Sequence, residues 1–328
     1  MNKKVISVLL ASLVLSLSAC DDKKNSEGND KQSASTTANG NAVENTQTKE
    51  DSVQEVSATD EAVSKKVNDY IKTNNTLMDF WKLGITEASI RWAEEDKVKV
   101  SKGDFTKIKR SGVFDRGSKA LEKTLQENTV NLGELDTAAK TLLETINTYL
   151  PKWQELEKYN EAKKFEDDNG AKGKELLVSY QEGLPKIEAA YKAFDQLLDV
   201  SMKQEQAKRI ALYKKEGRLL ELYTEESLGS AEKMLSLFEK TDDFKNQTKI
   251  DEANKILAQL DENLDALDKE YNARKAEQDS RVDSGYGSVH RDLTSFTGIY
   301  REARKNPKKA NDLVRKYNDA ISSYNRIR

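Results

Sequence analysis

The stretch KELLVSYQEGLPKIEAAYKAFDQLLDV, residues 174–200, decides the fold class of this chain. Its large apolar residues recur at alternating intervals of three and four: Leu177, Tyr180, Leu184, Ile187, Tyr191, Phe194 and Leu198. Such spacing places these side chains along one narrow stripe of a helix and is typical of the seam of a coiled coil or bundle. The stretch therefore predicts a long helix that packs against other helices.

Similar stripes occur on both sides of this stretch. They run through Val63, Val67, Tyr70, Asn74, Leu77, Trp81, Ala88 and Trp92, through Leu132–Leu156, through Ala253–Tyr271 and through Leu313–Ile327. Clusters of turn-forming residues separate them at Lys102–Gly117, Asp167–Gly173, Thr241–Gln247, Asp279–Gly287 and Asn306–Pro307. Pro151 predicts either a kink or the start of a new helix. We expect an all-α fold, an elongated antiparallel multi-helix bundle with coiled-coil-like seams, preceded by a disordered tether.

The composition excludes several classes of function. Among 328 residues there are 1 His and 1 Cys, which rules out zinc sites built from His and Cys, a disulfide framework and a Cys–His nucleophilic pair. A net charge of −3 argues against nucleic-acid binding, which needs a basic excess. We therefore expect no metal, no cofactor and no nucleic-acid partner. No pattern of residues indicates a catalytic site.

The first residues of the chain predict export and a lipid anchor. Lys3 and Lys4 precede an apolar run over Val5–Leu17, whose helix would be roughly 20 Å long and too short to cross a bilayer of ~30 Å. The tetrad Leu17, Ser18, Ala19 and Cys20 resembles the lipobox of bacterial lipoproteins, in which the cysteine is acylated after cleavage. This resemblance makes residues 1–19 a signal peptide and Cys20 the site of lipid attachment.

The residues after the cysteine predict a location and a tether. Asp21 and Asp22 resemble the sorting signal that retains lipoproteins in the inner membrane, so we favour the inner over the outer membrane, with the chain facing the periplasm. Residues 20–60 are almost entirely small or polar, and such composition does not support a packed core. We expect a disordered tether over residues 20–60 and one helical bundle domain over residues 61–328.

A few residues are candidates for ligand binding or catalysis. Trp81 and Trp92 share a helix face and could form a ligand platform, but core packing is the favoured interpretation, as it is for Trp153. His290 has no neighbouring catalytic partners in the sequence, and we expect a surface or capping role. The Gly-containing segment Asp167–Lys174 lacks the spacing of a phosphate-binding loop and predicts a turn between helices.

The C-terminal end is basic. Residues 281–328 contain eleven Lys and Arg against five acidic residues. They include a candidate patch for an anionic surface: Arg301, Arg304, Lys305, Lys308, Lys309, Arg315 and Lys316. Such a patch could contact phospholipid headgroups. The favoured alternative is that neighbouring acidic helix faces neutralise it.

The whole chain resembles the YiiG-like bacterial lipoproteins, a family built around a helical domain of unknown function. The residues that carry the resemblance are Cys20–Lys24, Val67–Lys72, Asp167–Asp168 with Ala171–Leu176, and the pairs Tyr317-Asn318 and Tyr324-Asn325. The family supplies no catalytic residues. The seven-residue spacing of the two Tyr-Asn pairs predicts tyrosines in a seam and asparagines at its rim.

These observations favour a non-enzymatic interaction or scaffold protein of the envelope. It would be anchored in the membrane by its lipid and would contact another envelope protein or polymer. The alternative is a periplasmic module that binds a small or lipidic ligand between its helices. A third hypothesis, an enzyme that uses paired carboxylates from distant positions, is the least favoured.

Overall fold

The computed structural model describes residues 47–82, 111–277 and 282–327, with side chains from residue 60 and without those of 79–82. Every regular element in these ranges is a helix, which confirms the all-α expectation. The α-helices are α1 (Gln47–Lys82), α3 (Gly112–Glu127), α4 (Glu134–Glu161), α5 (Ala171–Glu216), α6 (Leu219–Ser236), α7 (Gln247–Ala276), α8 (Ser284–Ala303) and α9 (Ala310–Tyr324). Short 3₁₀ helices are η2 (Lys164–Glu166), η3 (Thr241–Lys245) and η4 (Pro307–Lys309).

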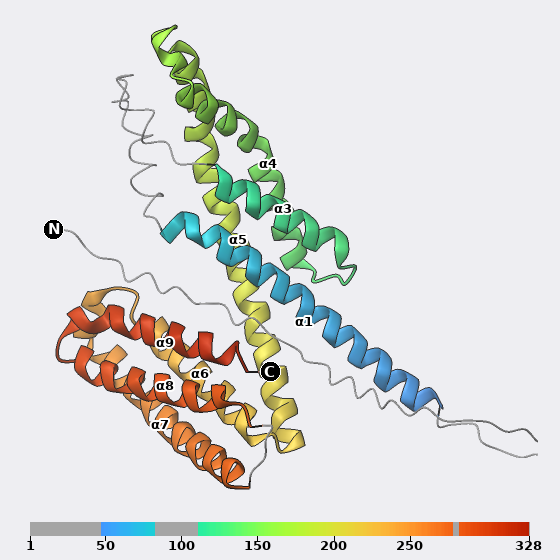
Figure 1. Ribbon diagram of the computed structural model, residues 1–328, viewed down its shortest axis with the longest axis vertical. Helices are drawn as coiled ribbons and strands as arrows, with labels where there is room; N and C mark the ends of the chain where they lie inside the picture. Colours follow the sequence, from blue (N-terminus) through green and yellow to red (C-terminus); the bar gives the residue numbers. More distant parts are fainter. Residues whose placement is uncertain (1–46, 83–110, 278–281, 328) are drawn as a thin grey trace, which may run out of the picture.

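The first of two large hydrophobic cores lies between α1, α3, α4 and the part of α5 from Leu176 to Leu198 (Figure 1). At its centre Trp153 of α4 packs edge-on against Phe114 of α3, with ring centroids 5.2 Å apart, and tilts against Tyr180 of α5 at 5.1 Å. Tyr70 of α1 meets Phe194 of α5 edge-on at 5.6 Å. Aromatic pairs of this geometry add to the free energy gained by burying the rings. We call this group of helices the first body.

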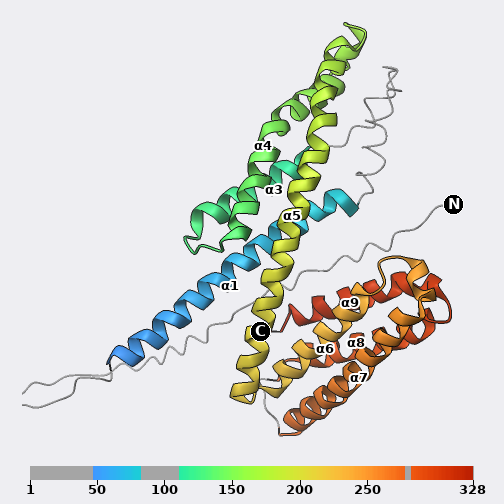
Figure 2. The same ribbon diagram turned by 180° about the vertical axis from the view of Figure 1, so that it is seen from behind.

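The second core is formed by α6, α7, α8 and α9, which lie side by side as a separate bundle in both views (Figures 1 and 2). Phe238 stacks on Phe244 with centroids 4.1 Å apart, next to the ring of Tyr300 on α8. Short connections join successive helices, so neighbours run antiparallel. We call this bundle the second body.

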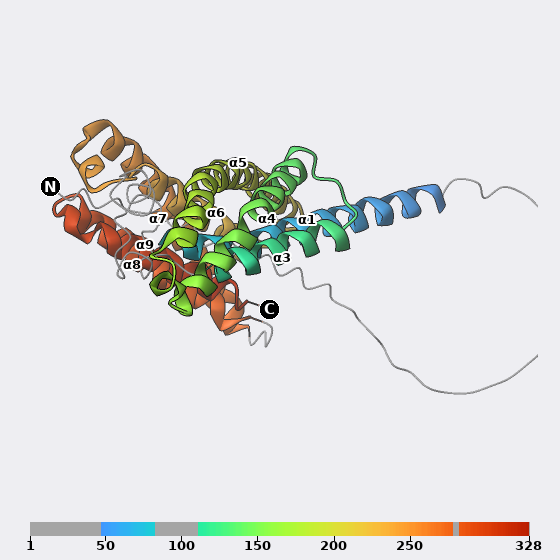
Figure 3. The ribbon, with the colours of Figure 1, turned by 90° about the horizontal axis from the view of Figure 1, so that it is seen from above.

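Helix α5 links the two bodies. It has 46 residues and therefore spans about 69 Å, and its residues from Leu176 to Leu198 contribute buried side chains to the first core. Its C-terminal half continues to the second body, where Gly217 ends it in a left-handed conformation with φ +67°. Seen from above, the second body lies on one side of α5 and the free end of α1 points away on the other (Figure 3).

The predicted seams are largely confirmed. All seven stripe residues of Leu177–Leu198 are buried, as are Ala253, Leu257, Leu260, Leu264 and Leu267 of α7. Helix α4 continues through Pro151, so the alternative of a new helix beginning there is wrong. Trp153 is 2% exposed in the first core, which confirms core packing for this residue.

Several breaks between helices lie at other positions than predicted, because some glycines lie inside helices at packing contacts and not in turns. Gly117 lies inside α3, although it was expected in a turn, and a Cβ there would overlap the side chain of Leu77 on α1. Gly285 and Gly287 lie inside α8, where a Cβ would press on Ile327 and on the ring of Tyr271. In these places the missing side chain allows two helices to approach closely.

Two further features differ from the sequence expectation. The breaks at 128–133 and at Gly217 lie between helices and were not predicted. Helix α1 begins at Gln47, upstream of Glu61, within the segment expected to be part of the tether. This upstream segment contains good helix formers such as Glu50, Gln54 and Ala58. Extending a helix that packing has already nucleated costs little.

Candidate functional site

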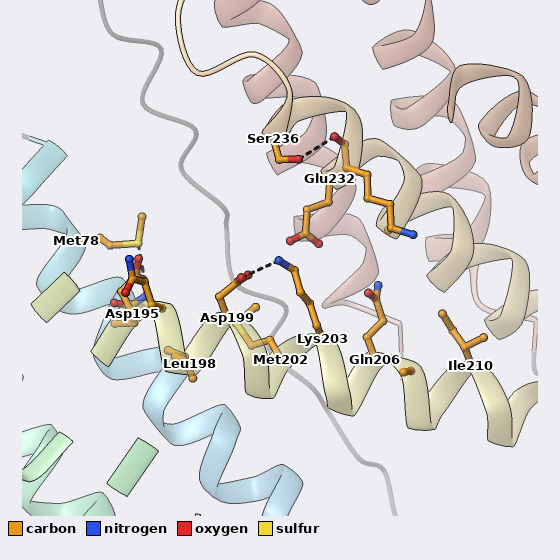
Figure 4. A pocket seen from close by; sticks show the side chains of 15 residues that line it. Met78, Asp195, Leu198, Asp199, Met202, Lys203, Gln206, Ile210, Glu232 and Ser236 are labelled. Atoms are coloured by element: carbon orange, nitrogen blue, oxygen red, sulfur yellow. Dashed lines mark hydrogen bonds and ion pairs between the residues drawn. The ribbon is translucent and has the colours of Figure 1, made fainter. Parts of the chain in front are cut away.

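A groove of about 620 Å³ lies where α1, α5 and α6 meet, between the two bodies (Figure 4). Its floor is apolar and includes Met78 of α1 with Leu198, Met202 and Ile210 of α5. Its polar side chains come from all three helices. A volume of this size is in the range of small-molecule sites, which are typically apolar with a few convergent polar groups.

Asp195 and Asn74 form the first polar group of the groove. The amide nitrogen of Asn74 donates to the carboxylate of Asp195 at 2.9 Å, joining α1 to α5. Burial raises the pKa of Asp195, the hydrogen bond from Asn74 opposes this, and the negative charge of Asp199 adds to it. Asn74 is 4% exposed, and its side-chain oxygen accepts no hydrogen bond from any described residue. In the described part of the chain, this end of the groove therefore offers acceptors, and its one amide donor already binds Asp195.

Asp199, Lys203 and Glu232 form the second polar group. Lys203 pairs with Asp199 one turn earlier on α5 at 2.7 Å, and Figure 4 shows both facing Glu232 across the groove from α6. Burial, followed by the charge of Asp199, raises the pKa of Glu232, while Lys203 and Lys233 oppose the shift. The hydroxyl of Tyr317 reaches Glu232 from α9. Lys203 is thus paired with Asp199, and its positive charge also lies near the carboxylate of Glu232.

Next to the groove, a buried carboxylate joins α6 to α5 and α9. Glu225 of α6 is 0% exposed and accepts from the Nε and Nη2 atoms of Arg209 on α5 at 2.7 and 3.2 Å. It also accepts from the hydroxyl of Tyr324 on α9 at 2.6 Å and from Gln206 of α5 at 3.4 Å. Burial, with the charge of Glu225 beside it, raises the pKa of Tyr324 well above its usual value, so the hydroxyl stays protonated and donates. We call this cluster the Glu225 clamp.

A second buried ion pair lies inside the first body. Lys66 of α1 contacts Asp136 of α4 at 2.8 Å, and the hydroxyl of Tyr70 donates to the same carboxylate at 2.7 Å. Burial alone would raise the pKa of Asp136, but the hydrogen bonds from Lys66, the Leu132 amide and Tyr70 hold it below the usual value. The carboxylate is fully partnered, so we interpret this cluster as a structural link between α1 and α4.

Comparison with known protein families gives a match over most of the chain. Residues 61–326 match the model of a family described as Protein of unknown function (DUF3829). The chain belongs to this family. The matched region begins at Glu61, where the helical pattern of the sequence also begins, and it contains every residue of the groove and of the Glu225 clamp. No curated protein and no solved structure matches the chain.

The residues singled out from the sequence take different places in this DUF3829 domain. Of the segment predicted as a turn, Asp167–Lys174, the first half (Asp167–Gly170) is a turn and the second half is already the first turn of α5. The Asp168 carboxylate accepts from the amides of Gly170 and Lys172 where the two halves meet. His290 lies on α8, partly exposed, with Nδ1 4.0 Å from the carboxylate of Asp268. Tyr317 is in the second core and Tyr324 in the Glu225 clamp.

The basic residues of the C-terminal patch are mostly paired. Four of the seven lie within 4.0 Å of acidic residues: Arg301 with Asp261, Lys309 and Arg315 with Asp312, and Lys316 with Asp292 and Asp319. Arg304 donates to Asn254 and lies over the ring of Tyr300. Among the described residues, Lys305 and Lys308 have no acidic partner. These pairs support neutralisation by neighbouring helices, and contact with an anionic surface stays a prediction.

Several predicted residues lie outside the described part of the chain. They are the signal peptide, the lipobox Leu17, Ser18 and Ala19, the anchor Cys20, the sorting residues Asp21 and Asp22, and Trp92; the side chain of Trp81 is also outside it. None of the helices in the described ranges is both long and apolar enough to cross a membrane. The described residues also contain no group of three or more His, Cys, Asp or Glu that could hold a metal ion.

The groove was not predicted from the sequence, although one signal for it was present. Asn74 occupies a position of the first apolar stripe, where a hydrophobic residue is the norm. A polar residue at a seam position must find a partner or leave a polar atom unsatisfied. Its partner, Asp195, is 121 residues away, so only the folded chain identifies it.

The Glu225 clamp predicts a large difference between two arginine substitutions. Arg209→Ala leaves the carboxylate of Glu225 buried without its cation, and we expect a loss of about 3–5 kcal/mol in the free energy of unfolding. Arg301→Ala removes a surface pair with Asp261 and should cost at most about 1 kcal/mol. Urea unfolding followed by circular dichroism measures both, and equal small losses would contradict the assignment of Glu225 as the critical buried charge.

The burial of Asp195 leads us to expect that its replacement by a neutral residue stabilises the protein. Because burial raises its pKa, the ionised carboxylate is less favourable in the folded than in the unfolded chain at pH 7. Asp195→Asn removes that charge, keeps an oxygen to accept from Asn74, and should raise the free energy of unfolding at pH 7. The gain should shrink as the pH falls through the titration of Asp195, since the wild-type carboxyl then becomes neutral. Asp265→Asn on the exposed face of α7 is the control, and a destabilised Asp195→Asn would refute the prediction.

Proposed function

We propose that this chain is a YiiG-like envelope lipoprotein, anchored through Cys20, that acts as a non-enzymatic interaction module. The observation that supports this function best is the division of the domain into two hydrophobic cores along one continuous helix. Helix α5 spaces two helical bodies along its length of about 69 Å, and this construction offers two separate surfaces to partners.

The N-terminal part of the sequence supports the membrane anchor in this proposal. A lipidated Cys20 followed by a polar tether would hold both bodies near the periplasmic face of the membrane while leaving their orientation free. The residues Asp21 and Asp22 favour the inner membrane. We propose an envelope protein or polymer as the partner, since the exteriors of the helices are charged and polar.

A second candidate function is a periplasmic module that binds a small ligand between its helices. The groove between α1, α5 and α6 favours it, because an apolar floor with convergent carboxylates has the character of a ligand site. This function is compatible with membrane anchoring, since a tethered domain keeps its groove accessible. The two candidates differ in the partner: a macromolecule on the outer helix faces, or a small molecule at the junction.

Replacing Cys20 tests the anchor. Cys20→Ser removes the thiol that would carry the lipid, and we expect the chain to lose its acyl mass and to move from the membrane fraction to the soluble fraction. Ser26→Ala, which changes a residue of the polar segment and leaves the signal peptide and the lipobox intact, is the matched control. Mass spectrometry of the N-terminal peptide and fractionation of cells give the two readouts. An unchanged membrane fraction for Cys20→Ser would contradict a lipid anchor at this residue.

Photo-crosslinking in intact cells tests the interaction function. A photoreactive residue is placed at Lys308 in the second body and, separately, at Val178 in the first, where the side chain is 50% exposed. We expect one dominant envelope protein or polymer to be captured from at least one position, and the purified partner to bind the purified chain. Buried Leu293 is the control position. Capture of no macromolecule from either exposed position would overturn the scaffold proposal.

A further inference from the structure

Among the described residues that line the groove between the two bodies, carboxylates outnumber lysines by three to two. The three carboxylates belong to Asp195, Asp199 and Glu232, and beside them lies the side-chain oxygen of Asn74, to which no described residue donates. Ionised carboxylates and amide oxygens are acceptors only. The facing cations are Lys203, already paired with Asp199, and Lys233, whose side chain belongs to the exposed edge of α6.

The Asn74 oxygen is buried and accepts no hydrogen bond from the described residues. A buried acceptor without a partner is unfavourable, and folded proteins leave few of them. Asn74 already uses its amide nitrogen to bind Asp195, so its oxygen and the adjoining carboxylate offer a pair of acceptors from two different helices. A group that satisfies both must carry several donors and a positive charge. An ammonium group has three donors and one positive charge.

We propose that the groove binds a small aliphatic amine, with its ammonium group between Asp195 and Asn74 and its hydrocarbon chain along the apolar floor. This inference rests on the second candidate function and specifies its ligand class. Met78, Leu198, Met202 and Ile210 supply the floor, and methionine side chains adapt readily to apolar chains of different shape. Glu232 adds a second negative charge from α6.

The charged groups around the site agree with this ligand. From α5 the site faces Asp195, Asp199 and Lys203; from α6, Glu232 and Lys233; from α1, the neutral Asn74; and from α9, the Tyr317 hydroxyl. Burial raises the pKa values of Asp195 and Glu232, which means that both ionised carboxylates lack sufficient compensation in the free protein. A bound ammonium would supply that compensation, whereas a carboxylate ligand would be repelled.

Three probes of similar length and different charge test the proposal on the purified full chain. They are n-octylammonium, n-octanol and octanoate, each titrated by isothermal calorimetry at physiological salt. We expect saturable binding of one octylammonium per chain, binding of octanol at least about tenfold weaker, and no binding of octanoate. Affinity for octylammonium should fall as the pH is lowered through the titration of the two carboxyls.

Matched variants locate the binding. Asp195→Asn should weaken octylammonium binding by about tenfold or more, because it removes a charge-assisted hydrogen bond. Glu232→Gln is the second variant and should also weaken it. Asp265→Asn changes the same net charge on exposed α7 and should leave binding unchanged. Thermal melting of each variant verifies that it is folded.

The outcomes distinguish failure of the proposed ligand class, an amine, from failure of the second candidate function, ligand binding in the groove. Octanol and octylammonium binding equally, with Asp195→Asn unchanged, would overturn the amine while leaving a ligand-binding groove. No binding of any of the three probes would overturn both the amine and the second candidate function. Loss of octylammonium binding in Asp265→Asn as well would show nonspecific attraction to a negative surface and would also overturn the site.

Discussion

The junction of the two bodies depends on the hydrogen bonds and the ion pair that the buried carboxylate of Glu225 forms. It lies on α6, fully buried, and receives hydrogen bonds from Arg209 and Gln206 of α5 and from Tyr324 of α9. A buried carboxylate without its cation costs several kcal/mol, so α5 cannot slide along the second body without breaking this set of contacts. The clamp thereby determines the register of α5 against α6.

The groove is a consequence of that register. Gln206 belongs to both features, since it lines the groove and donates to Glu225. With α5 held in this position, Glu232 of α6 faces Asp199 and Lys203 across the groove. Asp195 then remains as a carboxylate whose burial is unfavourable, and no described residue donates to the side-chain oxygen of its neighbour Asn74. Proteins concentrate such unfavourable arrangements at functional sites, because a ligand can compensate for them.

Much of the fold was predictable because periodicity reports burial directly. The stripe from Leu177 to Leu198 is buried at all seven positions. The turn predicted within Asp167–Lys174 forms at Asp167–Gly170, where the Asp168 carboxylate accepts from the Lys172 amide of α5. Glycine was a less reliable signal. The sequence predicts Gly117 and Gly287 as turn residues, but in the structure they lie inside helices and allow these to approach neighbouring helices, a role that depends on partners distant in the chain.

The sequence by itself determined the all-α class, the stripes that face the cores, and the turn that begins α5. These properties follow from residues within a few positions of one another, which share a helix face or a turn. Only the tertiary structure decided that the stripes form two cores, that Arg209 meets Glu225, and that Asn74 meets Asp195. These pairings join helices separated by up to 121 residues, and packing between distant elements, rather than local pattern, decides which polar groups share a buried site.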